Sequence, residues 1–457
     1  MPNPPAAIRR LPPQPRELLH DYLDRVAATE RRGEAREESF YPHLKELLEG
    51  HAEHRGWRDL EVLILPRKTE DCLFDLQVRR GARIVGYVEA KPPAMDLSRV
   101  AESDQLKRYR RAFPNLLLTN FRELLLYRGD TMAARADVAG GPEPVLALLD
   151  LFCDFAPPAS ASAAELAPRM ALRTRILASR LRELLKADTE RTSDLSGFYR
   201  AFSEHLLAGL KVEEFADLYA QTLSYGLLAA RWRAPGAFDR RIAAESIPAT
   251  SGVLRDAFRY ISLADPHKDI AWIIDEIVGL LAGAPVRAML AGSARRRGRD
   301  PVLDFYETFL QAYDPELRRR RGVYYTPPEL VSYVVHSVHR LLQTKLGRRD
   351  GLADSAVSLL DPAAGTMTFV AEAIHCAVEE TKRTTGGGAV PALVGDHLLR
   401  HFHAFELMMA PYAIGHLKMS LLLEELGRPL GEGERVSFYL TNALETHDLP
   451  QSTIPGT

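Results

Sequence analysis

The chain has 457 residues, a formal net charge of −2 and a hydrophobic share of 46%. This length exceeds what one ordinary core accommodates and, at about 150 residues per domain, predicts roughly three domains. The longest apolar runs fall short of the about 20 residues that a transmembrane helix needs, and the N-terminus lacks the apolar stretch of a secretory signal. Cys72, Cys153 and Cys376 have no paired spacing for zinc or disulfides, which favours a reducing, cytoplasmic location.

The N-terminal third of the sequence changes from a helical to a strand-like pattern. Apolar residues recur at helical spacing over residues 15–50, and short apolar or alternating runs follow over residues 60–130. One helix, Leu97–Arg111, is expected among the strands. The expected strands are Glu61–Leu65, Cys72–Val78, Ile84–Ala90, Asn115–Thr119 and Leu124–Tyr127. The pattern predicts a small mixed α/β domain over residues 15–150.

The rest of the chain divides into a helical and a second α/β region. Residues 156–164 have the composition of a linker, and the pattern of residues 165–310 is almost wholly helical, which predicts a helical connector over residues 165–315 and not a catalytic domain. A third region, residues 316–457, returns to an α/β pattern. The sequence contains no Gly-x-x-x-x-Gly-Lys-Ser/Thr loop, so nothing in it supports an ATP-driven motor.

Positive charge is gathered into three short clusters although the net charge is small. The clusters are Lys107–Arg111, Ala294–Arg299 and Arg318–Arg321. Clustered Lys and Arg side chains can neutralise DNA phosphates whatever the net charge of the chain. A solvated helix face or loop is the alternative interpretation of each cluster.

The first candidate site combines Asp75 with Glu89 and Lys91. Residues two apart on a strand share a face, so Glu89 and Lys91 project together, and a hairpin between residues 75 and 91 brings Asp75 to them. Carboxylate oxygens are the ligands that Mg²⁺ prefers, and a lysine beside them can orient water or stabilise developing charge. A chance occurrence of so loose a pattern is the alternative.

The surrounding sequence resembles the PD-(D/E)xK nucleases, in particular the branch found in type I restriction subunits and fused type II enzymes. A Gln105-x-x-x-Tyr109 helix follows the Glu-x-Lys strand, as in that branch. The resemblance implies an Mg²⁺-dependent nuclease with Asp75 and Glu89 as metal ligands, Lys91 as a catalytic residue, and Gln105 and Tyr109 supporting the site near DNA. Phe74 stands where the family motif has Pro. Glu38 matches a first-helix acid of several members, although a surface role fits it better.

The second candidate site lies in the C-terminal region, at the ends of predicted strands. Asp361-Pro-Ala-Ala-Gly365 follows the apolar strand Val357–Leu360, Glu406 ends a second strand, and Asn442 ends a third. A Gly-bearing turn and a carboxylate at the ends of parallel strands are typical of a nucleotide-binding site. Thr326 is placed to cap the helix that begins near Pro328. Taken singly, each feature also fits an ordinary turn or cap.

These segments closely resemble the S-adenosylmethionine-dependent adenine-N6 DNA methyltransferases of fused restriction–modification enzymes. The matching segments are Gly322-Val-Tyr-Tyr-Thr-Pro327, Leu359-Leu-Asp-Pro-Ala-Ala-Gly-Thr366, Phe405-Glu-Leu-Met-Met-Ala-Pro-Tyr412 and Tyr439-Leu-Thr-Asn442. The resemblance implies a Rossmann-like domain. It also implies a cofactor pocket lined by Thr326, Asp361, Ala363, Gly365, Glu406 and Asn442.

Two departures from that family affect the expected activity. Met367 replaces the second Gly of the usual Gly-Thr-Gly and is expected to crowd the turn. No Asn-Pro-Pro-Tyr or Asp-Pro-Pro-Tyr tetrapeptide occurs, and in the family this loop holds the flipped adenine. We therefore expect weak or absent binding of S-adenosylmethionine by the isolated chain, no methylation by it alone, and exposed apolar surface on the incomplete sheet.

Together the patterns predict a multidomain α/β protein: a nuclease domain, an all-helical connector and an incomplete methyltransferase domain. Such a chain resembles a restriction–modification enzyme of the type IIG or single-chain type I-like family, truncated within the methyltransferase. Its expected partners are double-stranded DNA and a complementary chain that carries the rest of the methyltransferase and the target-recognition domain. The alternative is a catalytically silent truncated product, or a split subunit that binds DNA or such a partner.

Overall fold

The computed structural model of the chain describes residues 15–32, 36–65, 74–81, 83–156, 160, 162–190, 192–205, 210–246, 268–290, 301–314, 326–431 and 434–444. The chain forms two compact units, residues 1–158 and 159–457, and each is considered by itself. Within the described residues, no helix is both long enough and apolar enough to cross a membrane.

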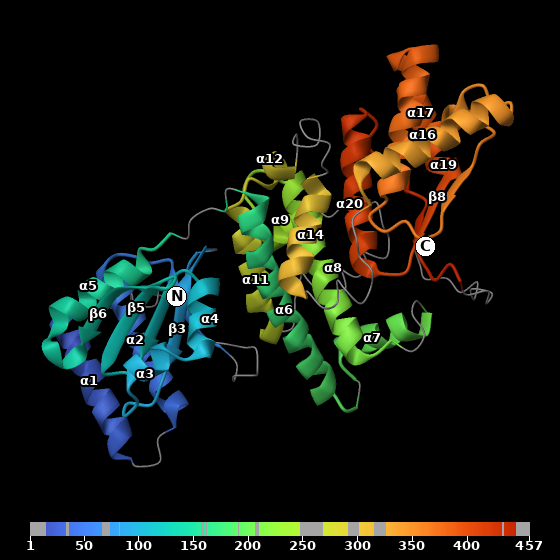
Figure 1. Cartoon of the computed structure of the whole chain (residues 1–457). Helices are drawn as coiled ribbons and strands as arrows, with labels where there is room; N and C mark the ends of the chain where they lie inside the picture. The colour runs from blue at the N-terminus through green and yellow to red at the C-terminus, as the bar shows by residue number, and fades with distance from the viewer. Residues whose placement is uncertain are drawn as a thin grey trace, which may run out of the picture. The chain divides into compact units, whose positions relative to one another are not determined.

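The first unit is a six-stranded mixed sheet with helices packed against it (Figure 1). The strands follow one another in chain order, and β3 with β4 is the parallel pair among antiparallel neighbours. This is the mixed α/β architecture predicted for residues 15–150. The elements are α1 (Pro15–Arg31), η1 (Glu37–Phe40), α2 (Tyr41–His54), β1 (Leu60–Ile64), β2 (Leu76–Arg80), β3 (Arg83–Ala90), α3 (Leu97–Ala101), α4 (Asp104–Ala112), β4 (Leu116–Thr119), β5 (Glu123–Arg128), β6 (Thr131–Asp137), η2 (Val138–Gly140) and α5 (Pro142–Cys153).

Alternation along β3 decides which side chains reach the core of this unit. Val88 and Ala90 are fully buried in the core cluster that contains Leu44 of α2 and Leu148 of α5. Successive strand residues point to opposite faces, so the intervening Glu89 projects from the other face of the sheet. Burial of the apolar residues therefore fixes the direction in which Glu89 points.

Two expectations for this unit require correction. The single helix predicted over Leu97–Arg111 is divided into α3 and α4, because the side chains of Asp96 and Ser103 each accept a bond from a backbone N–H and start a new helix. Strand β6 was not predicted, since the mostly exposed edge strand Thr131–Asp137 has no apolar run. The predicted strand Cys72–Val78 is described only from Phe74 onward, and β2 begins at Leu76.

The second unit begins with a helical bundle, as predicted for residues 165–315. Helix α6 packs against α8, α11 and α14, and a buried ion pair joins Arg173 of α6 to Glu276 of α11 at 2.7 Å. The helices are α6 (Ala163–Ala187), α7 (Asp194–His205), α8 (Val212–Arg233), α9 (Arg240–Ser246), α11 (Lys268–Ala282), α12 (Val286–Leu290) and α14 (Pro301–Tyr313). The later helix α20 packs along α8 within the same compact unit. The division of residues 165–457 into two domains stays a prediction.

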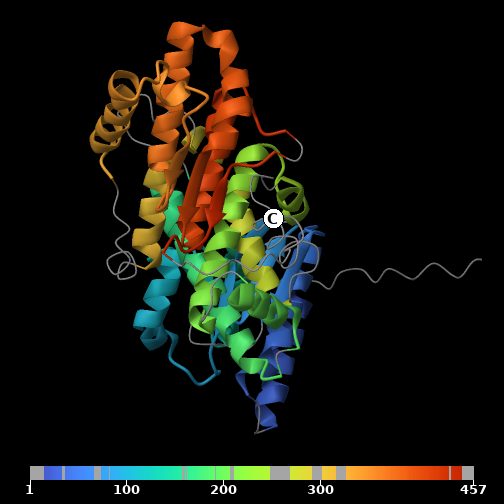
Figure 2. The same ribbon diagram turned by 90° about the vertical axis from the view of Figure 1, so that its right-hand side faces the viewer.

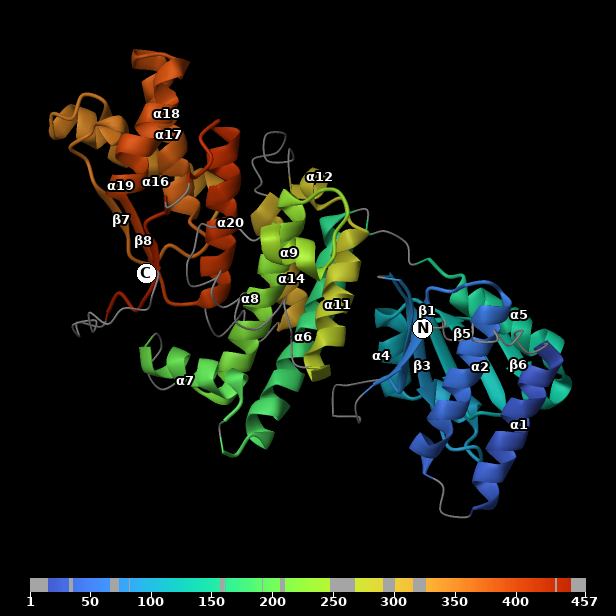
Figure 3. The ribbon, with the colours of Figure 1, turned by 180° about the vertical axis from the view of Figure 1, so that it is seen from behind.

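The remainder of the second unit holds a three-stranded parallel sheet in the order β7-β8-β9 (Figure 2, Figure 3). Its elements are α16 (Pro328–Lys345), η3 (Gly351–Ala353), β7 (Leu359–Asp361), α17 (Thr368–Thr384), η4 (Gly387–Ala389), α18 (Val390–Ala392), η5 (Leu393–Leu398), α19 (Leu399–His401), β8 (Phe402–Glu406), α20 (Met409–Glu425) and β9 (Phe438–Leu440). Three strands were predicted here, although the first lies at Leu359–Asp361 instead of Val357–Leu360. The strand–helix–strand alternation agrees with a Rossmann-like arrangement.

The two faces of this sheet differ in burial. Phe402, Ala404 and Phe438 are buried on one face, where α20 packs against β8 and β9. Leu360 and Tyr439 project from the other face and are 55% and 51% exposed. Parallel strands are normally covered on both faces. These two side chains therefore leave this face of the sheet partly exposed, while the predicted incompleteness of the sheet stays a prediction.

Candidate functional site

The turn after β7 is held by the end of the neighbouring strand β8. Gly365 N donates to Glu406 Oε2 at 2.8 Å, and Ala364 N donates to the Phe405 carbonyl at 2.9 Å. Met408 N donates to Glu406 Oε1 at 2.7 Å. The Glu406 carboxylate, 7% exposed, thus joins the turn after β7 to the segment after β8. Each carboxylate oxygen still has a lone pair with which it can accept another hydrogen bond.

Asp361 places a second carboxylate at the same end of the sheet. Its Oδ1 accepts a bond from Ala363 N at 3.2 Å, while Oδ2 is buried and has no hydrogen-bond partner among the described residues. Burial raises the pKa of Asp361, and burial likewise raises the pKa of Glu406 despite the backbone N–H groups that lower it. Two partly desolvated carboxylates favour a ligand that brings hydrogen-bond donors or positive charge.

The turn backbone itself is accessible. Gly365 has φ +55°, and no atom lies within 4 Å of the position that a Cβ would occupy. A ligand can therefore approach this backbone closely, which is the usual reason for a Gly at such a turn. At the end of β9, Thr441 N donates to the Glu406 carbonyl at 2.9 Å. The predicted residues Asp361, Ala363, Gly365, Glu406 and Asn442 thus gather at the carboxyl ends of three adjacent strands.

The expected role of Thr326 as a helix cap is wrong. The N-cap of α16 is Pro327, and no side chain caps this helix end. A helix can start without a side-chain cap when proline fixes φ at its first turn, as Pro328 does here. The proposed part of Thr326 in a cofactor pocket stays a prediction.

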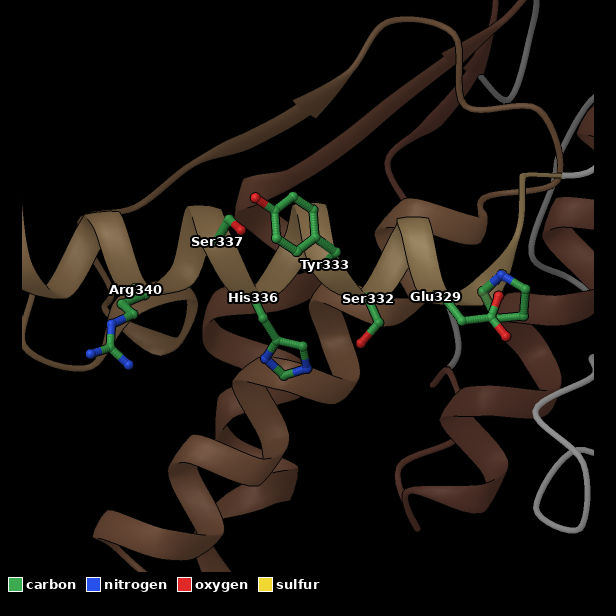
Figure 4. Close-up of a pocket in the computed structure, with 7 residues that line it drawn as sticks. Glu329, Ser332, Tyr333, His336, Ser337 and Arg340 are labelled. Atoms are coloured by element: carbon green, nitrogen blue, oxygen red, sulfur yellow. The ribbon is translucent and has the colours of Figure 1, made fainter.

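Helix α16 also carries a shallow hollow of about 630 Å³ that the sequence did not predict (Figure 4). All the residues that line it belong to α16: Pro328, Glu329, Ser332, Tyr333, His336, Ser337 and Arg340. Because binding pockets depend on polar groups that converge from several elements, this groove along one helix is a poor cofactor site. The carboxylates at the strand ends remain the better candidate.

Met367 does not crowd the turn as expected. It adopts the left-handed conformation, with φ +61°, and its side chain is 1% exposed in the core. A Cβ added at Gly415 of α20 would lie 3.1 Å from Met367 Cγ, so the absence of a side chain at Gly415 makes the room that Met367 occupies. The departure from Gly-Thr-Gly therefore leaves the outer side of the turn open.

In the first unit, the three predicted nuclease residues lie together at one end of β2 and β3. Lys91 Nζ donates to Glu89 Oε1 at 2.5 Å, and the Glu89 side chain is 2% exposed. Asp75 N donates to the Val88 carbonyl at 3.0 Å, and Asp75 Oδ2 accepts from Ala90 N at 2.6 Å. The antiparallel register, with Leu76 opposite Val88, therefore brings Asp75 beside Glu89.

Two residues near Asp75 were missed from the sequence. The Tyr41 hydroxyl lies 2.6 Å from Asp75 Oδ1 and 3.0 Å from Glu37 Oε1. Burial, followed by the hydrogen bond to Asp75, raises the pKa of Tyr41, so its hydroxyl stays a donor. Glu38, the acid singled out in the sequence, is exposed. One feature of the sequence could have indicated the contact between Glu37 and Tyr41. The two residues are four positions apart, which places their side chains on the same face of a helix.

The supporting residues of the predicted nuclease are placed less completely. Tyr109 is buried with its ring 5.1 Å from that of Phe74, which precedes Asp75. Gln105 lies in the first turn of α4, where the structure describes its backbone but not its side chain. Their roles stay predictions.

The basic clusters do not offer a set of free cations in the described part of the chain. In Lys107–Arg111, Lys107 pairs with Glu102 at 3.0 Å, and Arg110 is buried over the Tyr127 ring at 4.7 Å. The buried Arg110 side chain therefore neither lies on a solvated helix face nor is exposed for contact with a DNA phosphate. The clusters Ala294–Arg299 and Arg318–Arg321 lie outside the described residues.

The carboxylates of Asp75 and Glu89 are suitable ligands for a hard divalent cation that binds few protein groups. Among the described residues, no group of three or more His, Cys, Asp or Glu side chains is placed to share a metal ion. Mg²⁺, however, is commonly bound through one or two carboxylates and keeps several waters. Asp75 and Glu89, which lie opposite each other at the ends of the paired strands β2 and β3, supply such a pair of carboxylates.

Comparison with known proteins finds one family model that matches part of the second unit. Residues 297–414 match the family model described as N-6 DNA Methylase. This segment contains β7, the turn at Gly365 and all of β8, and so includes Asp361 and Glu406 but not Asn442. No curated protein matches the chain.

Several solved structures are similar to the chain at low identity. A DrdV–DNA complex determined by cryoEM is 21% identical with a TM-score of 0.40, over 92% of this chain and 40% of that one. A nuclease-deletion mutant of the Type ISP restriction-modification enzyme LlaGI, in complex with a DNA substrate mimic, is 16% identical with a TM-score of 0.43, over 65% and 22%. The type IIG restriction endonuclease BpuSI is 13% identical with a TM-score of 0.26, over 88% and 42%. The chain thus spans less than half the length of each.

The packing of Met367 against Gly415 yields a test of the turn. Gly415→Ala would place a Cβ 2.6 Å from the Phe438 ring, so we expect it to destabilise the second unit by about 1–3 kcal/mol through overpacking. Gly279→Ala in α11 is the matched control, because nothing lies within 4 Å of its Cβ position, and it should stabilise by about 0.5–1 kcal/mol. Urea unfolding of both variants measures the difference. The same sign of change in both would contradict this account of Met367.

Proposed function

We propose that the C-terminal part of this chain is the cofactor-binding part of an S-adenosylmethionine-dependent adenine-N6 DNA methyltransferase. The observation that carries the proposal is the pair of bonds from Gly365 N and Met408 N to the Glu406 carboxylate, in a segment that matches the N-6 DNA Methylase family. They fix a carboxylate and an accessible backbone turn side by side at the ends of parallel strands, where α/β folds bind nucleotides.

Each residue has a distinct task in this proposal. Glu406 accepts hydrogen bonds from the ribose hydroxyls through the lone pairs that its backbone donors leave. Asp361, whose Oδ2 has no partner among the described residues, accepts from the cationic amino group. Gly365 lets the ligand approach the backbone. When bound, S-adenosylmethionine supplies the methyl group that is transferred to the adenine amine.

Glu406, Asp361 and Gly365 bind the cofactor in this proposal and do not recognise the target adenine. The 457 residues contain neither an Asn-Pro-Pro-Tyr nor an Asp-Pro-Pro-Tyr loop. We propose that double-stranded DNA is the substrate and that residues outside these 457 supply this loop and target recognition. The exposed apolar face that carries Leu360 and Tyr439 is a surface that such residues could cover, because parallel strands are normally covered on both faces.

Cofactor binding is tested by titrating S-adenosylmethionine into the purified chain in a calorimeter. Because Met367 is buried and does not crowd the turn, we expect weak but measurable binding by the wild type. Binding should be weakened at least tenfold further in Asp361→Asn and Glu406→Ala, because each variant removes a buried acceptor. Glu379→Ala is the control and should bind as the wild type does, since Glu379 is exposed on α17 and pairs with the nearby Lys382. No binding by any form would refute the proposal for the chain alone and favour the silent or split-subunit alternative.

We propose a second activity for the first unit, Mg²⁺-dependent cleavage of DNA. The contact between Lys91 Nζ and Glu89 Oε1, beside the buried Asp75, is the observation that favours it. Asp75 and Glu89 would hold the ion, which when bound polarises the scissile phosphate. Lys91 orients the attacking water and neutralises charge as it develops. Joined in one chain, the two activities describe a restriction–modification protein.

Nuclease activity is tested by nicking of supercoiled plasmid with Mg²⁺. We expect weak cleavage by the wild type with little sequence preference. Asp75→Asn and Lys91→Ala should lower the rate by a hundredfold or more, because each removes a group that acts on the phosphate or its ion. Melting curves check that both variants are folded at the assay temperature. Lys382→Ala, at an exposed lysine of α17, should leave the rate unchanged. If a variant with alanine at Asp75, Glu89 and Lys91 cleaves the plasmid as fast as the wild type, a contaminating nuclease is responsible and the proposal is refuted.

A further inference from the structure

The Asp75 carboxylate is fixed at both oxygens by groups from different elements. Oδ2 accepts from Ala90 N of β3 at 2.6 Å, and Oδ1 accepts from the Tyr41 hydroxyl of α2 at 2.6 Å. The Asp75 residue is 3% exposed, so little water competes for these bonds. A carboxylate torsion is otherwise broad, and two bonds of this kind restrict it to one orientation.

Tyr41 is itself held in place before any ion binds. It is the first residue of α2, belongs to the core cluster and is 6% exposed, with its ring 6.5 Å from that of Phe121. Phe121 is packed in turn, because its ring stacks on that of Phe40 at 5.0 Å and it is fully buried. The Tyr41 hydroxyl is thus presented to Asp75 by a packed aromatic support.

A second carboxylate reaches the same hydroxyl. Glu37 Oε1, from η1, lies 3.0 Å from the Tyr41 oxygen. A hydroxyl has one proton and donates to one acceptor at a time, and the shorter separation assigns it to Asp75. Acids from η1 and from the start of β2 therefore converge on one tyrosine.

We propose that Tyr41 is a positioning residue of the nuclease site, whose hydroxyl keeps the Asp75 carboxylate in the orientation that binds Mg²⁺ together with Glu89. This inference rests on the nuclease activity proposed above. Tyr41 touches neither DNA nor the ion in this role and acts only through Asp75. Without the hydroxyl, ion binding would have to order the carboxylate as well, so ion affinity should fall while the chemistry at saturating ion is retained.

The test compares Tyr41→Phe with Tyr22→Phe in the full chain. Both tyrosines are buried, both donate one hydrogen bond in the first unit, and only Tyr41 donates to a carboxylate. The rate of plasmid nicking is measured against Mg²⁺ concentration, and binding of Mn²⁺ is measured directly by electron paramagnetic resonance. Melting curves check that both variants are folded.

We expect Tyr41→Phe to raise the half-saturating Mg²⁺ concentration and the Mn²⁺ dissociation constant by about 3- to 10-fold, the effect of one lost hydrogen bond. The rate at saturating Mg²⁺ should change by less than about 2-fold, and Tyr22→Phe should match the wild type in both assays. If the two variants depend on ion concentration in the same way, the positioning role of Tyr41 is overturned. It is also overturned if Tyr41→Phe lowers the saturating rate and leaves the ion affinity unchanged. Both outcomes leave the nuclease proposal itself standing. A wild type that neither binds Mn²⁺ nor cleaves would overturn the nuclease proposal and this role with it.

Discussion

The C-terminal site depends on the carboxylate of Glu406. Its two oxygens accept bonds from Gly365 N and Met408 N, so one side chain at the end of β8 fixes the turn after β7 and the start of the segment that leads to α20. Because the carboxylate is buried, these bonds are made in a medium of low dielectric, where they are strong and where their loss is costly. The Glu406 carboxylate thus helps to hold the accessible backbone at Gly365 in place.

In the first unit too, a buried carboxylate accepts hydrogen bonds from separate segments of the chain. Asp75 joins Ala90 N of β3 to the Tyr41 hydroxyl of α2, so that a buried carboxylate again connects elements that are distant in the sequence. In each unit the acid that organises the site is also one of the groups that we propose to bind the ligand. Stability of the site and binding by the site are therefore properties of the same side chain.

Sequence reasoning located the parts of both sites that depend on strand pattern. Asp361, Gly365 and Glu406 follow apolar runs, and Glu89 and Lys91 alternate along one strand, so their proximity follows from strand geometry. It missed Tyr41 and Glu37, because their contact with Asp75 depends on how α2 packs on the sheet. It also misjudged Met367, since the room for that side chain is made by Gly415 on another helix. Contacts between elements, unlike strand faces, leave no periodic signal.

The most direct test of the C-terminal site is hydrogen exchange of the intact chain with and without S-adenosylmethionine, read by mass spectrometry. If Glu406 and the turn form the cofactor site, the ligand should slow exchange over residues 363–367 and at Met408, and Glu406→Gln should abolish this protection while other segments exchange as before. Unchanged exchange over residues 363–367 at saturating ligand, or protection that survives in Glu406→Gln, would contradict the account.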